Sequence, residues 1–184
     1  MTTQLHKSKT YTVEEYMKLP DNGKRYELIE GELIEMPGPS YDHGTITSDL
    51  IGALREYLKS QGQSPRQALT NMAFALALKT AVVPDVAFIT AEKAKNVDGS
   101  KAFQGAPDLA VEIISPTDKW SEIIAKVKLY QSYQVTPVWV VDPFDQSVFI
   151  YRPDQATRLL FAGDDLSGEE VLPGFTLPVK DLFP

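Results

Sequence analysis

The sequence contains no cysteine, which excludes disulfides, iron–sulfur clusters and cysteine-ligated zinc. It contains only two histidines, His6 and His43, so a histidine-rich metal cluster is excluded as well. No apolar run approaches the roughly 20 residues that a membrane-spanning helix needs. Because the N-terminal residues also lack the apolar segment of a signal sequence, we predict no membrane partner and a cytoplasmic location.

Basic residues are fewer than acidic ones. The chain has 18 Lys+Arg against 25 Asp+Glu, which gives a net charge of −7. This balance argues against a protein that coats nucleic acid through overall positive charge. It is compatible with an enzyme that cleaves a polyanion, because a bound cation and a local basic rim can supply the attraction.

The length of 184 residues and the hydrophobic content of 43% suit one domain with a single continuous core. Residues 1–11 show no hydrophobic periodicity, so we expect a flexible N-terminus there. Thr12 and Glu15 have the spacing of a capping box, which predicts a short helix through about Leu19 before Pro20 ends it. We therefore expect one domain over residues 12–184.

The remaining elements follow from the spacing of apolar residues. The pair Glu30-Gly31 predicts the turn of a β-hairpin over 25–29 and 32–36. Helical spacing predicts two long helices, over 44–61 and 119–134. Strand-like segments cover 67–69, 72–78, 82–89, 109–114, 137–141 and 148–151, with a charged loop over 93–101 and short strands or turns over 159–182.

The segment from Leu109 to Val141 has the length and pattern of a βαβ crossover, which predicts two parallel strands joined by a right-handed connection. Taken together, the elements predict the α/β (α+β) class and a mixed β-sheet flanked by helices, with an N-terminal helix and hairpin.

Two carboxylates stand in otherwise apolar strands. Asp85 lies near the start of the segment 82–89, and Glu112 lies in the middle of 109–114. Burying a carboxylate among valines and isoleucines costs several kcal/mol unless a cation or hydrogen bonds compensate. Two such residues on adjacent strands suggest a shared partner, and ligation by oxygen alone favours a hard cation such as Mg²⁺ or Mn²⁺.

Asp108 is a second candidate for the partner of Glu112, and strand geometry decides against it. Four residues at about 3.3 Å each place the two roughly 13 Å apart along one strand. Ligands of one Mg²⁺ each lie about 2.1 Å from the ion. Asp85 lies on a neighbouring strand and can therefore reach the same ion as Glu112.

A cleavage site of this kind also needs a protein cation to orient water or to stabilise charge. The helix predicted over 119–134 offers Lys126 and Lys128. At 100° per residue, Lys126 falls on the apolar face and Lys128 points away from it. We therefore expect Lys126 to reach back toward the sheet and Lys128 to be solvated.

Each of these residues also has a purely structural interpretation. Asp85 follows a proline and could accept backbone hydrogen bonds at the entry to a strand. Glu112 could form a salt bridge to Lys126 without any metal. Glu32 follows a hairpin turn, where a solvated side chain is expected, and His43 precedes a helix, where it could serve the helix N-terminus.

Several short motifs share their order and spacing with a known family. The motifs are Tyr26–Leu33, Pro84–Phe88, Pro107–Pro116, Lys126 with Tyr130, and Val138–Pro143. In these the chain resembles, over about residues 12–184, the Uma-two family, also called domain of unknown function 820. That family belongs to the restriction-endonuclease-like PD-(D/E)XK superfamily.

The resemblance implies a restriction-endonuclease-like fold, a Mg²⁺-dependent nuclease site and a homodimer. It maps the Asp and Glu of the superfamily to Asp85 and Glu112 and the helical lysine of the family to Lys126. It also maps Glu32 and His43 to acidic and histidine positions near the site. The usual strand lysine would fall at Ile114, where it is missing.

The predicted function is a metal-dependent endonuclease that hydrolyses phosphodiesters, with DNA as the expected partner. Asp85, Glu112 and the carbonyl of Ile113 would hold Mg²⁺ or Mn²⁺. Lys126 would act on water and phosphate, Glu32 would add a ligand or water contact, and His43 would contact substrate. The alternative is a catalytically inactive dimeric interaction protein that keeps the nuclease fold, and a third is a phosphoesterase for RNA or small substrates.

Overall fold

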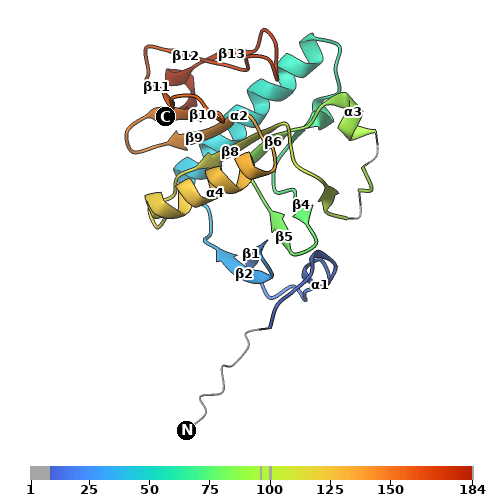
Figure 1. Ribbon diagram of the computed structural model, residues 1–184. Helices are drawn as coiled ribbons and strands as arrows, with labels where there is room; N and C mark the ends of the chain where they lie inside the picture. The colour runs from blue at the N-terminus through green and yellow to red at the C-terminus, as the bar shows by residue number, and fades with distance from the viewer. Residues whose placement is uncertain (1–8, 96, 100, 184) are drawn as a thin grey trace.

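The computed structural model describes residues 9–95, 97–99 and 101–183. The predicted fold class is confirmed, because two β-sheets with both parallel and antiparallel neighbours are packed with helices (Figure 1). The predicted flexibility of residues 1–8 lies outside the described residues. The amide of Tyr11 donates to the carbonyl of Gly31 in the hairpin at 2.8 Å.

The larger sheet forms the centre of the molecule. Its strands lie in the order β11 (Arg158–Leu160), β10 (Ser147–Tyr151), β9 (Val138–Asp142), β8 (Leu109–Ile113), β6 (Val86–Phe88) and β3 (Ala68–Leu69). Strands β8 and β9 are parallel, and helix α4 (Trp120–Ser132) connects them. The predicted βαβ unit with its two parallel strands is therefore confirmed.

The smaller sheet has the order β2 (Glu32–Met36), β1 (Arg25–Ile29), β5 (Thr80–Val82), β4 (Phe74–Ala77) and β7 (Phe103–Gln104). The hairpin of β1 and β2 has the predicted bounds. Its turn residues Glu30 and Gly31 have φ of 50° and 90°, as a type I′ turn requires, and glycine adopts such angles without steric cost.

The other elements are short, apart from helix α2 (Tyr41–Ser60). The capping box of Thr12 and Glu15 is present at the start of α1, which is shorter than predicted. These remaining elements are α1 (Val13–Tyr16), η1 (Pro65–Gln67), α3 (Ala91–Ala94), the strand pair β12 (Asp165–Ser167) and β13 (Thr176–Pro178), and η2 (Val179–Leu182).

The larger sheet has a helix on each face. In Figure 1, α4 lies in front of β8 and β9, and α2 lies behind them. Leu109, Val111 and Ile113 of β8 pack with the buried leucines of α2, whereas Ala110 and Ile114 pack with the buried face of α4. Because side chains alternate along a strand, Glu112 belongs to the face covered by α4.

The prediction of one strand over residues 82–89 is wrong. Val82 ends β5 in the smaller sheet, and Val86 begins β6 in the larger one. Val83, Pro84 and Asp85 carry the chain across, and the proline has no N–H to donate to either ladder. Asp85 is thereby placed where the two sheets meet.

Within the described residues, no helix combines the length and the apolar character that crossing a membrane requires.

Candidate metal and catalytic site

Asp85 and Glu112 lie side by side at the junction of the two sheets. Strands β6 and β8 are antiparallel, with Val86 opposite Val111 and Ala87 opposite Ala110. One further step in this register places Asp85 opposite Glu112. Residues directly opposite have Cβ atoms about 4.5–5.5 Å apart. The two carboxylates therefore share one face of the sheet, as the sequence predicts.

Both oxygens of Asp85 have a partner. Oδ2 accepts a hydrogen bond from the amide of Ile113 at 2.7 Å, which ties the end of β8 to the start of β6. Oδ1 lies 3.0 Å from Nε2 of His43. Each carboxylate oxygen has two lone pairs, so neither contact uses the full accepting capacity of the side chain.

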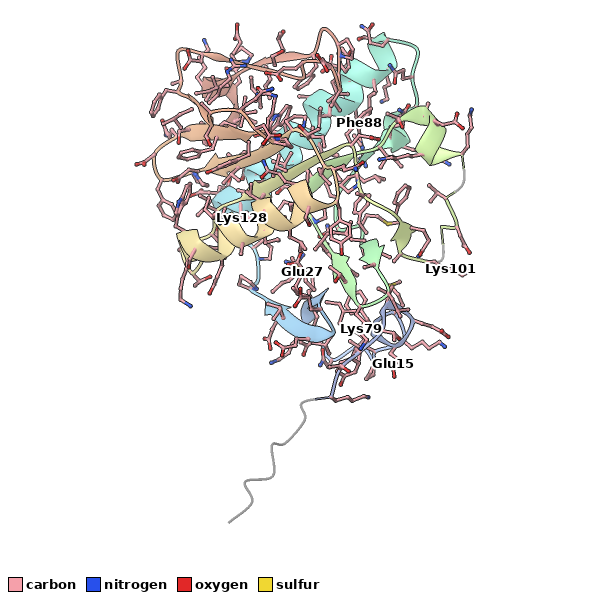
Figure 2. The ribbon with its side chains drawn as sticks, viewed as in Figure 1. Glu15, Glu27, Lys79, Phe88, Lys101 and Lys128 are labelled. Atoms are coloured by element: carbon pink, nitrogen blue, oxygen red, sulfur yellow. The ribbon has the colours of Figure 1, made fainter. Side chains whose placement is uncertain are left out.

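Glu112 is buried beneath α4 and held from two sides. Lys126 donates to its Oε2 at 2.7 Å, and the Tyr130 hydroxyl donates to its Oε1 at 2.6 Å. Lys126 and Tyr130 lie four residues apart on α4, so both project from the same side of the helix. Lys128 is exposed (Figure 2). Lys126 therefore reaches back toward the sheet and Lys128 is solvated, as the helical spacing predicts.

Glu27 of β1 is a third carboxylate at the site, and the sequence prediction missed it. Its Oε1 lies 3.1 Å from Nζ of Lys126 and accepts a hydrogen bond from the amide of Val83 at 2.8 Å. Figure 2 shows Glu27 between the hairpin and α4. Its sequence signal is the same as that of Glu112, because Glu27 stands in a strand between Tyr26 and Leu28.

Glu32, by contrast, is not brought to the site. It lies at the exposed start of β2, next to the turn, and is not among the residues that line the pocket described below. The predicted placement of Glu32 is therefore corrected. The hairpin places Glu27 of β1 near α4 and leaves Glu32 at the start of β2 exposed to solvent.

His43 lies in the first turn of α2, where the side chain of Ser40 caps the helix by accepting the amide of His43. Its Nε2 faces Asp85, and its Nδ1 is buried with no hydrogen-bond partner among the described residues. The hydrogen bond with Asp85 raises the pKa of His43, and burial opposes this rise. The structure thus places His43 beside a candidate ligand.

The buried charges perturb one another strongly. Burial raises the pKa of Glu112; Lys126 opposes the rise, and the carboxylates of Asp85 and Glu27 add to it. Burial works to lower the pKa of Lys126, but Glu112 and Glu27 outweigh it and hold that pKa above its usual value. Burial and the Glu112 carboxylate raise the pKa of Tyr130. Negative charge therefore exceeds what Lys126 alone compensates.

The rejected candidate Asp108 lies at the other end of β8. It accepts the amide of Thr90 at 2.7 Å and forms a salt bridge to Lys93 at 2.8 Å. Ile114, which stands at the position of the usual strand lysine, packs in the core on the α4 side. Lys126 therefore brings its ammonium group to Glu112 from the helix instead of from the strand.

A pocket of about 370 Å³ lies over these groups, between the hairpin, the start of α2, the end of β8 and α4. Among the described residues that line it, six are acidic and two, Arg25 and Lys126, are permanent cations. The acidic ones are Glu27, Glu35, Asp85, Glu112, Asp118 and Glu122. Such a lining attracts a cation and repels an anion.

The donor set fits a hard divalent cation. Oxygen ligands suit Mg²⁺, which is commonly held by one or two carboxylates and completes its shell with waters and substrate phosphate. Asp85 and Glu112 would supply the two carboxylates, and Ile113, which also lines the pocket, would supply its carbonyl. The described residues include no cluster of three or more Asp, Glu or His side chains arranged as ligands of one ion. A water-rich Mg²⁺ site therefore fits better than an all-protein cage.

The hydroxyl of Tyr130 is expected to support Glu112 measurably. Tyr130→Phe removes only this donor and leaves Oε1 of a buried carboxylate without its partner. Hydrogen bonds to charged groups contribute about 1.5–3 kcal/mol, so we expect the free energy of unfolding to fall by about that amount. Urea denaturation of the variant beside Tyr133→Phe, whose hydroxyl has no such role, measures it. Equal stability of the two variants would contradict the assignment.

Comparison with known proteins points to nucleases. The family model Uma2, described as "Putative restriction endonuclease", matches residues 13–180. Among solved structures, the chain is similar to "a putative nuclease belonging to DUF820 from Anabaena variabilis ATCC 29413". The TM-score is 0.80 and the identity 25%, over 94% of this chain and 97% of that chain. No curated protein matches the chain.

Proposed function

The chain belongs to the Uma2 family of restriction-endonuclease-like proteins, and on this premise we propose that it is a metal-dependent endonuclease that hydrolyses DNA. The observation that carries the proposal is an acidic pocket in which Asp85 lies opposite Glu112 while Glu112 and Glu27 share the ammonium group of Lys126. A pocket lined in this way needs a bound cation before a phosphodiester can approach.

In the proposed mechanism, Asp85, Glu112 and the carbonyl of Ile113 would hold Mg²⁺ or Mn²⁺. When bound, the ion supplies Lewis acidity toward a phosphoryl oxygen and lowers the pKa of a coordinated water. His43 orients Asp85 and forms part of the wall that substrate contacts. Tyr130 orients Glu112 through its Oε1.

Lys126 supplies the fixed positive charge of the site. Its ammonium group orients the attacking water by donating a hydrogen bond and stabilises the negative charge that develops on the phosphate. Glu27 lies 3.1 Å from this ammonium group, so we place Glu27, rather than Glu32, as the further acidic residue of the site. The proposal includes the homodimer that the resemblance implies.

Asp85→Asn is expected to remove most of the cleavage activity. Asparagine keeps the shape of the side chain but removes the charge that holds the ion, and metal catalysis contributes several kcal/mol. We expect Mg²⁺-supported cleavage of plasmid DNA to fall by about a hundredfold or more. EDTA should abolish the activity of the wild type, and added Mg²⁺ should restore it.

Asp108→Asn is the matched control, because it changes a partly buried, ion-paired carboxylate that lies outside the site. Its activity should stay close to that of the wild type. Equal cleavage by wild type and Asp85→Asn, purified in parallel, would point to a contaminant and contradict the proposal. RNA and a small phosphodiester tested in the same assay define the substrate class.

A second candidate function is a non-catalytic dimeric protein that keeps the nuclease fold. One observation favours it: the four carboxylate oxygens of Asp85 and Glu112 all have partners within the chain. In this case Lys126 permanently replaces a metal as the compensating charge. The two functions differ in whether the pair binds a divalent cation.

A further inference from the structure

The acidic pocket opens beside a second hollow whose charged lining residues are mostly basic. This lateral groove has a volume of about 490 Å³ and includes Lys24, Asn71 and Lys101 in its lining. The two hollows share Arg25 and Met36. Three basic residues and one acidic residue are the charged groups among the described residues of the groove. In a chain of net charge −7, this local basic character stands out.

Arg25 differs from the other two basic residues of the groove in its partners. Lys24 is paired with Glu35 at 2.7 Å, and Lys101 is paired with Asp98 at 2.8 Å. Within the described part of the chain, Arg25 forms no salt bridge. Its charge therefore stays available to a ligand.

The guanidinium group of Arg25 is nevertheless held in place. It donates to Oδ1 of Asn71 at 3.0 Å and to the carbonyl of Pro37 at 3.3 Å. Both acceptors are neutral, so they orient the group without cancelling its charge. An arginine has five N–H donors in a planar fork that matches a phosphate, and these two contacts leave three of them free.

The position of Arg25 on β1 directs it toward the site. Arg25 and Glu27 lie two residues apart on one strand, so their side chains leave the same face, and both line the acidic pocket. Two residues of a strand span roughly 7 Å. A nucleic-acid strand that passes the acidic pocket therefore has a neighbouring backbone phosphate within reach of Arg25.

We infer that Arg25 binds a backbone phosphate of the nucleic-acid strand next to the scissile phosphodiester, and that this strand continues into the lateral groove. The inference rests on the proposed function and adds the path of the substrate to it. It also adds a fixed cation at the edge of the acidic pocket, which attracts the polyanion there.

Binding of a fluorescently labelled DNA duplex in Mg²⁺ buffer, followed by anisotropy at several salt concentrations, tests the inference. Arg25→Gln is expected to weaken binding by about tenfold to a hundredfold, as for loss of a charge-assisted hydrogen-bonded pair. It should also reduce the slope of log affinity against log salt by about 1, which a purely structural role of Arg25 would not do. Arg25→Lys keeps the charge but loses the planar fork of N–H donors, so its affinity for DNA should lie between those of the wild type and Arg25→Gln.

Arg66→Gln is the matched control, because Arg66 is exposed on η1 and lines neither hollow. Its affinity and salt slope should equal those of the wild type. Equal values for Arg25→Gln and Arg66→Gln, or no DNA binding by the wild type, would overturn the inference. If the wild type cleaves DNA but Arg25→Gln binds it as tightly as the wild type does, the inference fails and the proposed function stands. If Arg25→Gln binds DNA more weakly but the wild type does not cleave it, the inference stands and the proposed catalysis fails.

Discussion

Replacing Glu112 with glutamine is expected to reduce Mg²⁺-supported DNA cleavage by about a thousandfold, because metal catalysis contributes several kcal/mol and each 1.36 kcal/mol is tenfold. Glutamine has nearly the volume of glutamate and keeps one oxygen that can accept from Lys126, while the Tyr130 hydroxyl can accept from its amide group. The loss therefore reports the missing charge and not a packing defect. Single-turnover cleavage of a labelled duplex measures the rate.

The double variant Asp85→Asn with Glu112→Gln sharpens this prediction. If both carboxylates hold one ion, losing either removes the ion, and the second substitution should cost little more. Groups that act as a unit show such strong non-additivity. If the loss of activity in the double variant equalled the product of the losses in the two single variants, a shared ion would be contradicted.

Lys126→Met is expected to be the most destabilising of the site substitutions. The lysine side chain is 21% exposed and compensates Glu112 and Glu27, whose side chains are 6% exposed. Removing one partner of a buried ion pair typically costs about 3–5 kcal/mol, because the remaining charge is left unpaired. Urea denaturation should show a loss of this size, and activity should fall with the loss of the ammonium group.

Lys128→Met makes the same chemical change two residues further along α4, where the side chain is exposed. Surface substitutions of this kind usually change stability by no more than about 0.5 kcal/mol. Wild-type stability in Lys126→Met, or equal losses in both variants, would contradict the assignment of Lys126 as the compensating charge.

The core of this site follows from the sequence because its members conflict with their surroundings. Asp85 and Glu112 are charged residues in apolar strands, and the cost of burying them predicts a shared partner. Strand spacing excludes Asp108, which the structure places with Lys93 at the far end of β8. Helical phase selects Lys126, which lies 2.7 Å from Glu112.

Other parts of the site depend on contacts between segments far apart in sequence. Glu27 shows the same conflict as Glu112, but only the packing of the hairpin against α4 distinguishes it from Glu32. Apart from Asp85, the sequence 82–89 is apolar on both sides of Pro84, so its pattern cannot reveal that the chain changes sheets there. The contact of His43 with Asp85 likewise depends on how α2 packs.

The acidic lining explains why the global charge of the chain is a poor guide to its substrate. A net charge of −7 and six acidic pocket residues would exclude phosphate from the site if no cation were bound. With a divalent ion between Asp85 and Glu112, and Arg25 at the pocket's edge, the same pocket can accept a phosphodiester. Metal binding is therefore the step on which the proposed function depends.

Isothermal titration calorimetry with Mn²⁺ and Mg²⁺ tests the central claim most directly. We predict saturable binding of one ion per chain to the wild type, absent in Asp85→Asn and unchanged in Asp108→Asn. No saturable binding to the wild type, or equal binding to Asp85→Asn, would contradict the account and leave Glu112 and Lys126 as a structural ion pair.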